Sequence, residues 1–238
     1  GYLPLRELLV KRLGLHRGLN ITSDDLIITS GSQTAIVLIN SAFLESGDTV
    51  VMENFSYIGM LGDLRARGIN VVGVKMDDHG MQMDDLRSTL DDLHVRGVRP
   101  KYIYTIPTVH NPTGTILPME RRLEMLRLSQ DYNVPIIEDD CYSDLVFENF
   151  TEPAIKSLTQ SNYVIYIGSF SKNVAPGLRL GYIVAPWVVL SRLLPLKGDL
   201  GSSNFGQMVV ADFFENHADQ HLSLIHISEP TRRYAISY

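Results

Sequence analysis

One lysine in this chain has a setting that suits covalent chemistry better than a place on the surface or in the core. Lys172 lies in the stretch YIGSFSKNVAPGLRLGY, residues 166–182, just after an apolar run and among small residues. Ser169 precedes it by three positions, and Arg179 follows it by seven. Partial desolvation and neighbouring cations favour the neutral form of such an amine, which can form a Schiff base with a carbonyl. Arg179 could anchor a phosphate. The alternative is an ordinary loop lysine.

Three acidic residues end another apolar run. Glu138, Asp139 and Asp140 follow two isoleucines, and such acids are costly to bury without partners. Asp139 could hold a cation such as a protonated ring nitrogen, and Tyr142, three residues later, could reach a ligand hydroxyl. A metal site is a competing interpretation, but the sequence places no second cluster of His, Cys or carboxylate at another strand end. The structural alternative pairs Glu138 and Asp140 with surface cations.

Three further segments carry side chains that suit a ligand. In TSGSQTA, Gly31 permits a tight turn, and Ser32 and Gln33 open a helix whose free N–H groups suit a phosphate. An ordinary N-cap at Ser32 explains the same residues. Tyr57, in ENFSYIG, could stack on a flat ligand or pack half-buried. Asn111, in HNPTG, is typical of a turn, yet its amide could bind a ligand oxygen.

The elements around these residues place them at one edge of a sheet. Apolar runs alternate with helical patterns, which indicates an α/β fold with a mainly parallel sheet covered on both faces, a three-layer α/β/α sandwich. In such sheets ligands bind beyond the carboxyl ends of the strands. We expect seven strands, at 25–30, 48–54, 70–76, 101–107, 134–140, 163–169 and 178–186, and helices at 33–44, 57–67, 83–95 and 118–132 and at the start of the chain.

The candidate residues together describe one ligand. A phosphate, a flat ring, a ring oxygen, a cationic ring nitrogen and an aldehyde are the parts of pyridoxal 5'-phosphate. The segments SGSQ, HNPTG, EDDCY and SFSKNVAPGLRLGY resemble those of class I/II aminotransferases of fold type I, in the family's chain order. The resemblance covers residues 1–222 and implies the large, cofactor-binding domain of the aspartate aminotransferase fold.

The resemblance also implies a role for each residue. Lys172 would form the Schiff base with the cofactor and move a proton, and Asp139 would keep the ring nitrogen protonated. Asn111 and Tyr142 would bind the ring oxygen, and Tyr57 would stack on the ring. The phosphate would be held by Gly31, Ser32, Gln33, Ser169 and Arg179. The reaction would move an amino group between an amino acid and a 2-oxo acid.

Two other functions fit the same motifs. One is the effector domain of a MocR-type transcriptional regulator, in which a DNA-binding domain precedes the same fold. The other is a different pyridoxal phosphate reaction, such as β-elimination or decarboxylation. The intact NPTG segment, residues 111–114, favours the enzyme, of the aromatic or 2-aminoadipate aminotransferase type.

Composition excludes several classes of function for this segment. The formal net charge is −6 with no basic block, which argues against a nucleic-acid surface. No apolar run is long enough to cross a membrane. The single cysteine, Cys141, is compatible with a reducing cytoplasm, where we expect the protein to act.

Both ends of the chain differ from what the family resemblance implies for a whole protein. Residues 223–238 resemble translated sequencing-adapter DNA, and we expect them to be a non-native tail. The resemblance implies an N-terminal arm and a C-terminal small domain, including an arginine that binds the substrate carboxylate, and neither is found here. We therefore expect a chain truncated at both ends and inactive as it stands, with a homodimer as the full-length form.

Overall fold

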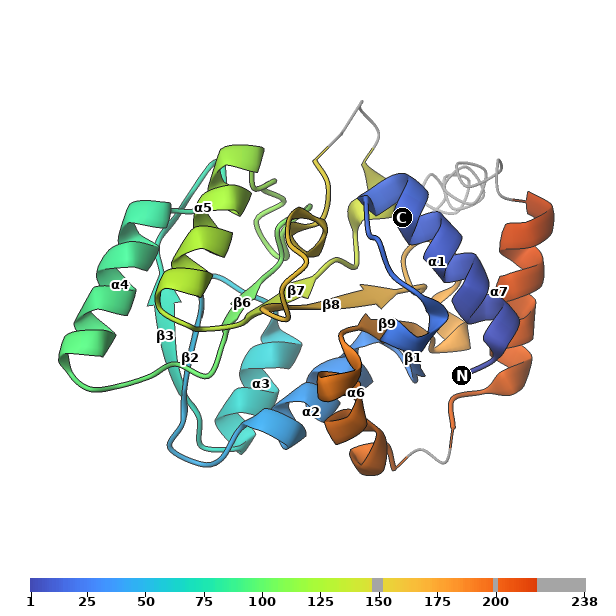
Figure 1. The fold of residues 1–238 in the computed structure, drawn as a ribbon, viewed down its shortest axis with the longest axis horizontal. Helices are drawn as coiled ribbons and strands as arrows, with labels where there is room; N and C mark the ends of the chain where they lie inside the picture. The colour runs from blue at the N-terminus through green and yellow to red at the C-terminus, as the bar shows by residue number, and fades with distance from the viewer. Residues whose placement is uncertain (147–151, 199–200, 218–238) are drawn as a thin grey trace, which may run out of the picture.

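A seven-stranded sheet forms the centre of the molecule, in a computed structural model that describes residues 1–146, 152–198 and 201–217 (Figure 1). The strand order is β1-β9-β8-β7-β6-β2-β3. Every pairing is parallel except those of β9, which runs antiparallel to β1 and β8. The predicted mainly parallel sheet is confirmed. Its strands are β1 (Leu26–Thr29), β2 (Thr49–Glu53), β3 (Asn70–Val74), β6 (Ile103–Thr105), β7 (Ile136–Asp139), β8 (Val164–Ser169) and β9 (Gly181–Val184).

Helices cover both faces of the sheet, as the three-layer prediction requires (Figure 1). One face carries α2 (Ser32–Phe43), α3 (Ile58–Ala66) and α6 (Trp187–Leu193). The other face carries α4 (Met83–Val95) and α5 (Met119–Asp131), and beside them α1 (Leu3–Arg17) and α7 (Asn204–His217).

The apolar strands read as continuous runs because both of their faces are buried. Successive residues of a strand point to opposite faces. In β8, Ile165 and Ile167 pack on the side of α2, while Val164 and Tyr166 pack on the other side.

Short elements connect these layers. A hairpin is formed by β4 (Met76–Asp77) and β5 (Gly80–Met81), and the 3₁₀ turns are η1 (Ser23–Asp25), η2 (Ser143–Leu145), η3 (Ile155–Leu158), η4 (Pro176–Leu178) and η5 (Leu194–Leu196). Within the described part of the chain, each helix is too short or too polar to span a membrane. The predicted non-native tail, residues 223–238, lies outside the described residues.

The reversed direction of β9 brings one more segment to the carboxyl edge of the parallel strands. Gly181, the first residue of β9, pairs with Ser169, the last residue of β8. The sequence predicted a strand from 178, but the strand begins at Gly181, and Arg179 lies in a turn with φ 49° and ψ 51°. Because β9 starts where β8 ends, Arg179 lies at the same edge as Lys172.

Candidate functional site

A cavity of about 270 Å³ opens at the carboxyl edge of the parallel strands. Nine of the ten predicted site residues line it: Ser32, Gln33, Tyr57, Asn111, Asp139, Tyr142, Ser169, Lys172 and Arg179. Gly31, the tenth, precedes Ser32 and lies against Arg179. Four lining residues were not predicted as site residues: Ile106, Cys141, Ser171 and Pro176. The structure thus brings the candidates together, while their roles toward a ligand stay predictions.

Asp139 is a buried carboxyl at the end of β7. Its Oδ2 accepts a hydrogen bond from the Tyr104 hydroxyl at 2.7 Å, and its Oδ1 accepts one from the Cys141 thiol at 2.9 Å. Burial raises the pKa of Asp139, and these two hydrogen bonds oppose that rise. Both of these donors are neutral, so a cation in the cavity would stabilise the ionised carboxylate further.

An amide, a phenol and an amine lie together on another wall of the cavity. Asn111 Nδ2 donates a hydrogen bond to the Tyr142 hydroxyl at 3.1 Å. The Lys172 Nζ lies 5.9 Å from the centroid of the Tyr142 ring. Burial raises the pKa of Tyr142, so its hydroxyl keeps its proton near neutral pH and can donate it to a ligand oxygen. Lys172 lies in a turn after β8 and is exposed, open to a ligand in the cavity.

The start of α2 and Arg179 form an end of the cavity that suits an anion. The first N–H groups of a helix have no partner within it, and they carry the positive end of the helix dipole. A Cβ on Gly31 would lie 2.9 Å from Arg179 Nη2 and would displace the guanidinium, and the φ of 89° at this position favours glycine. A Cβ on Gly181 would lie 2.6 Å from the Ser32 nitrogen, so the start of β9 also packs tightly here.

The interpretation of Ser32 as an ordinary N-cap is wrong. Gly31 is the N-cap of α2, with φ 89°, and no side chain caps the helix. Ser32 is therefore the first helical residue, and its side chain lines the cavity. The positive φ explains the difference, because a glycine reaches this conformation without a steric cost.

Tyr57 is half-buried, as one of the two interpretations predicted, and it also lines the cavity, where its stacking on a ligand stays a prediction. It occupies the N-cap position of α3 without a side-chain capping bond, and its ring packs against the core formed with α2 and α3. Gln33 Nε2 donates a hydrogen bond to the Gly59 carbonyl at 3.3 Å. Gln33 thereby ties α2 to α3 next to Tyr57, and it lines the cavity from that position.

Glu138 and Asp140 do not pair with surface cations, and that interpretation is wrong. Asp140 Oδ2 accepts hydrogen bonds from Arg17 Nε and from the Tyr166 hydroxyl, both at 2.7 Å, and Arg17 is only 5% exposed. Glu138 accepts the backbone N–H groups of Ile155 and Lys156. The alternation of the strand explains this, because residues on either side of Asp139 face away from the cavity.

Sequence reasoning missed the residues that support the acidic segment. Tyr104 could have been found, because it lies in the strand adjacent to β7 and pairs with Ile137, two residues before Asp139. Cys141, as the single cysteine of the chain, indicates from sequence alone only compatibility with a reducing compartment. Arg17 gave no local signal, since its partner Asp140 lies 123 positions away in the chain.

The family comparison agrees with this geometry. The model of the family described as aminotransferase class I and II matches residues 1–234. The chain belongs to this family. The resemblance drawn from the four sequence motifs is thereby confirmed, and the matched range includes most of the segment predicted to be a non-native tail, which stays a prediction.

Proteins named as aminotransferases and proteins named as transcriptional regulators are both similar to this chain. Aromatic-amino-acid aminotransferase 1 of Thermococcus litoralis is 34% identical over 236 residues, 98% of this chain and 57% of that protein. The uncharacterized HTH-type transcriptional regulator YdfD of Bacillus subtilis is 38% identical over 237 residues, 98% of this chain and 48% of that protein. The chain therefore spans about half the length of these curated relatives.

Solved structures of the family share the fold closely. The kynurenine aminotransferase of Pyrococcus horikoshii, solved with pyridoxamine phosphate (PMP), superposes with a TM-score of 0.89 at 35% identity. The match covers 99% of this chain and 59% of that one. The fold predicted from the sequence is confirmed.

Proposed function

We propose that this chain is the pyridoxal-phosphate-binding part of an aminotransferase, which moves an amino group between an amino acid and a 2-oxo acid. The observation that carries the proposal is the convergence of Lys172, Asp139 and Arg179 on one cavity from three segments of the chain. Family membership and the named relatives support the cofactor and the class of reaction.

The residues present fit pyridoxal phosphate. The close approach of Gly31 to Arg179 places a guanidinium beside the N-terminus of α2, and this combination suits a phosphate. Asp139 is a buried carboxyl with neutral hydrogen-bond donors, which suits a protonated ring nitrogen. When bound, the cofactor supplies an aldehyde that reacts with amines and a ring that accepts electrons from the substrate α-carbon.

Each side chain then has a distinct task. Lys172 Nζ would hold the cofactor at its aldehyde carbon and, when free, would carry a proton to and from the substrate α-carbon. Asp139 would keep the ring nitrogen protonated, and the Tyr142 hydroxyl and Asn111 amide would orient the ring oxygen. Arg179 would bind the phosphate together with the N–H groups that open α2.

The regulator is the second candidate, because YdfD is similar to this chain over the same residues. A regulator would bind the cofactor at the same cavity but release no 2-oxo acid. We also propose that this chain does not turn over by itself, since its relatives are about twice as long, and that the full-length enzyme is a homodimer.

The first experiment tests the cofactor site on this chain. After incubation with pyridoxal phosphate and reduction with borohydride, we expect peptide mass spectrometry to find the label on Lys172. Lys172→Ala should lose the label, whereas Lys11→Ala, on the exposed face of α1, should keep it. Label scattered over many lysines would contradict the proposed site.

The second experiment separates enzyme from regulator. Residues 1–217 are joined to the part of the Pyrococcus horikoshii enzyme that follows the position aligned with residue 217. We expect this chimera to convert kynurenine, the substrate named for that enzyme, and to lose conversion with Lys172→Ala. A folded chimera that carries the cofactor on Lys172 but releases no product would favour the regulator.

A further inference from the structure

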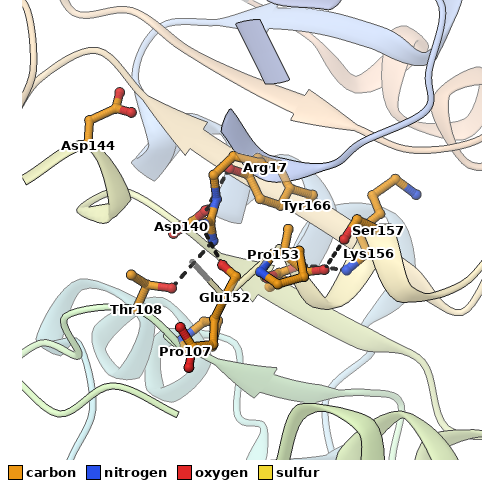
Figure 2. Close-up of polar contacts among 12 residues, drawn as sticks. Arg17, Pro107, Thr108, Asp140, Asp144, Glu152, Pro153, Lys156, Ser157 and Tyr166 are labelled. Atoms are coloured by element: carbon orange, nitrogen blue, oxygen red, sulfur yellow. Dashed lines mark hydrogen bonds and ion pairs between the residues drawn. The ribbon is translucent and has the colours of Figure 1, made fainter. Parts of the chain in front are cut away.

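Arg17 is the last residue of α1, and it reaches from there into the interior behind the acidic segment of β7. Its Nε donates a hydrogen bond to Asp140 Oδ2 at 2.7 Å, and its Nη1 donates one to the Glu152 carbonyl at 3.0 Å (Figure 2). Gly18, in the left-handed conformation with φ 71°, ends the helix directly after it. Although burial opposes it, the charge of Asp140 raises the pKa of Arg17 above its ordinary value. The two groups therefore form a buried ion pair.

Asp140 is the neighbour of Asp139 but faces the opposite way. Asp139 lines the cavity, while Asp140 faces Arg17 and Tyr166. Two adjacent buried carboxylates repel each other, since little solvent screens them. Burial raises the pKa of Asp139 most, and the charge of Asp140 raises it further. The negative charge of Asp140 therefore disfavours the ionised form of Asp139.

We propose that Arg17 is a positioning residue for the cofactor site: by pairing with Asp140, it lets Asp139 keep its negative charge toward the cavity. This inference rests on the proposed function, in which Asp139 holds the protonated ring nitrogen of pyridoxal phosphate. Without Arg17, the negative charge of Asp140 would have no counter-ion and would favour the protonated form of Asp139. The proton between Asp139 and the ring nitrogen would then move onto Asp139. The ring would then be neutral and a weaker acceptor of electrons.

Other titratable groups also face Asp139, and the test must keep them constant. They are Tyr104 from β6, Cys141 and Tyr142 from the segment after β7, Tyr57 before α3, and Glu53 from β2. Of these groups, Glu53 titrates near neutral pH, because burial raises its pKa to about 7. All variants are therefore compared at fixed pH, and a Glu53→Gln background removes the titration of that group.

The experiment measures directly whether the ring nitrogen of the cofactor is protonated. The 238-residue chain is loaded with pyridoxal phosphate carrying nitrogen-15 in the ring, and the chemical shift reports whether that nitrogen is protonated. We expect a pyridinium signal in the parent chain and a move toward neutral pyridine in Arg17→Met. For a change of about one pKa unit, cofactor affinity should fall about tenfold. The double variant Arg17→Met/Asp140→Asn removes both charges and should restore the pyridinium signal.

Two further variants make the outcome decisive. Arg6→Met, on the same helix but bonded to the Ser23 carbonyl, should leave the signal unchanged. If Arg17→Met does not fold, Asp140→Asn gives the opposite test, because an unbalanced Arg17 favours the ionised form of Asp139. At the same pH its pyridinium signal should be no weaker than in the parent chain, and a move toward neutral pyridine would contradict the inference. An unchanged ring nitrogen in folded Arg17→Met, or a double variant that does not recover, overturns this inference alone. Failure of the parent chain to bind the cofactor at Lys172 overturns the proposed function and this inference with it.

Discussion

Asp139 and Glu53 are both buried carboxyls, but their surroundings differ. Asp139 opens to the cavity, whereas Glu53 Oε1 accepts hydrogen bonds from the Thr105 hydroxyl at 2.6 Å and the Ile106 N–H at 3.1 Å. Glu53 Oε2 lies 3.9 Å from His110 Nε2. Burial raises the pKa of Glu53 to about 7 and lowers that of His110 to about 4. Between these values both groups are neutral, so this close contact is not an ion pair there.

The first residue-scale prediction concerns Asp139→Ala. The variant removes the carboxylate proposed to hold the ring nitrogen, and a hydrogen bond to a charged group contributes about 2 kcal/mol. Cofactor binding, followed by absorbance titration, should therefore weaken about 30-fold, while borohydride still labels Lys172. An affinity equal to that of the parent chain would show that Asp139 does not contact the cofactor.

The second concerns the pH dependence of stability at Glu53. Its pKa is raised from 4.5 in the unfolded chain to about 7, so the folded state binds the proton more tightly. Its contribution to stability is complete at low pH and is lost as pH rises from about 4.5 to about 7, by at most about 3 kcal/mol. His110 acts in the opposite direction, because its lowered pKa adds stability as pH rises from about 4 to about 6.5.

Glu53→Gln should therefore uncover the pH dependence of His110, which Glu53 opposes in the parent chain. Relative to the parent chain, the variant should gain unfolding free energy as pH rises from about 4.5 to about 7, measured by urea denaturation at each pH. A constant difference between the two proteins across this range would mean that Glu53 titrates normally.

At the scale of elements, the phosphate end of the site depends on where α2 starts and where β9 starts. The predicted strand boundaries were within about three residues of those in the structure, because buried apolar runs define them well. The direction of β9 could not be predicted from its own residues, since an apolar run reads alike in parallel and antiparallel pairings. Arg179 was predicted for the site from its spacing to Lys172, and the reversal of β9 is what brings it there.

Gly31→Ala tests this element-scale arrangement. The side chain would meet Arg179 Nη2 at 2.9 Å in a residue with φ 89°, so both backbone strain and displacement of the arginine are expected. Gly47→Ala is a matched control, because its φ of 91° is similar but nothing lies within 4 Å. Both variants should lose about 1 kcal/mol of stability, measured by thermal unfolding. Only Gly31→Ala should lose affinity for pyridoxal phosphate. Equal affinity losses in the two variants would contradict the proposed phosphate site at Arg179 and the start of α2.

For the molecule as a whole, local patterns predicted the layers but not the connections between distant segments. The apolar runs and helical spacings indicated the sandwich, since burial acts on each element separately. The ion pair of Arg17 with Asp140 and the hydrogen bond of Tyr102 with Asn40 join residues 123 and 62 positions apart, so only the folded chain brings them together. The site depends on distant segments in the same way, because its residues come from strand ends, turns and the start of α2, spread between positions 31 and 179.

A ligand that bridges these loops should stabilise the entire fold. A ligand that binds only the folded state adds about 2.7 kcal/mol when its concentration is 100 times Kd, so pyridoxal phosphate should raise the thermal midpoint of the chain. Pyridoxal lacks the phosphate and should raise it less, because Arg179 and the start of α2 then have no anion to bind. In Lys172→Ala the increase with pyridoxal phosphate should shrink but persist, since the phosphate contacts remain. Equal stabilisation by pyridoxal and pyridoxal phosphate would place the binding elsewhere than at this edge of the sheet.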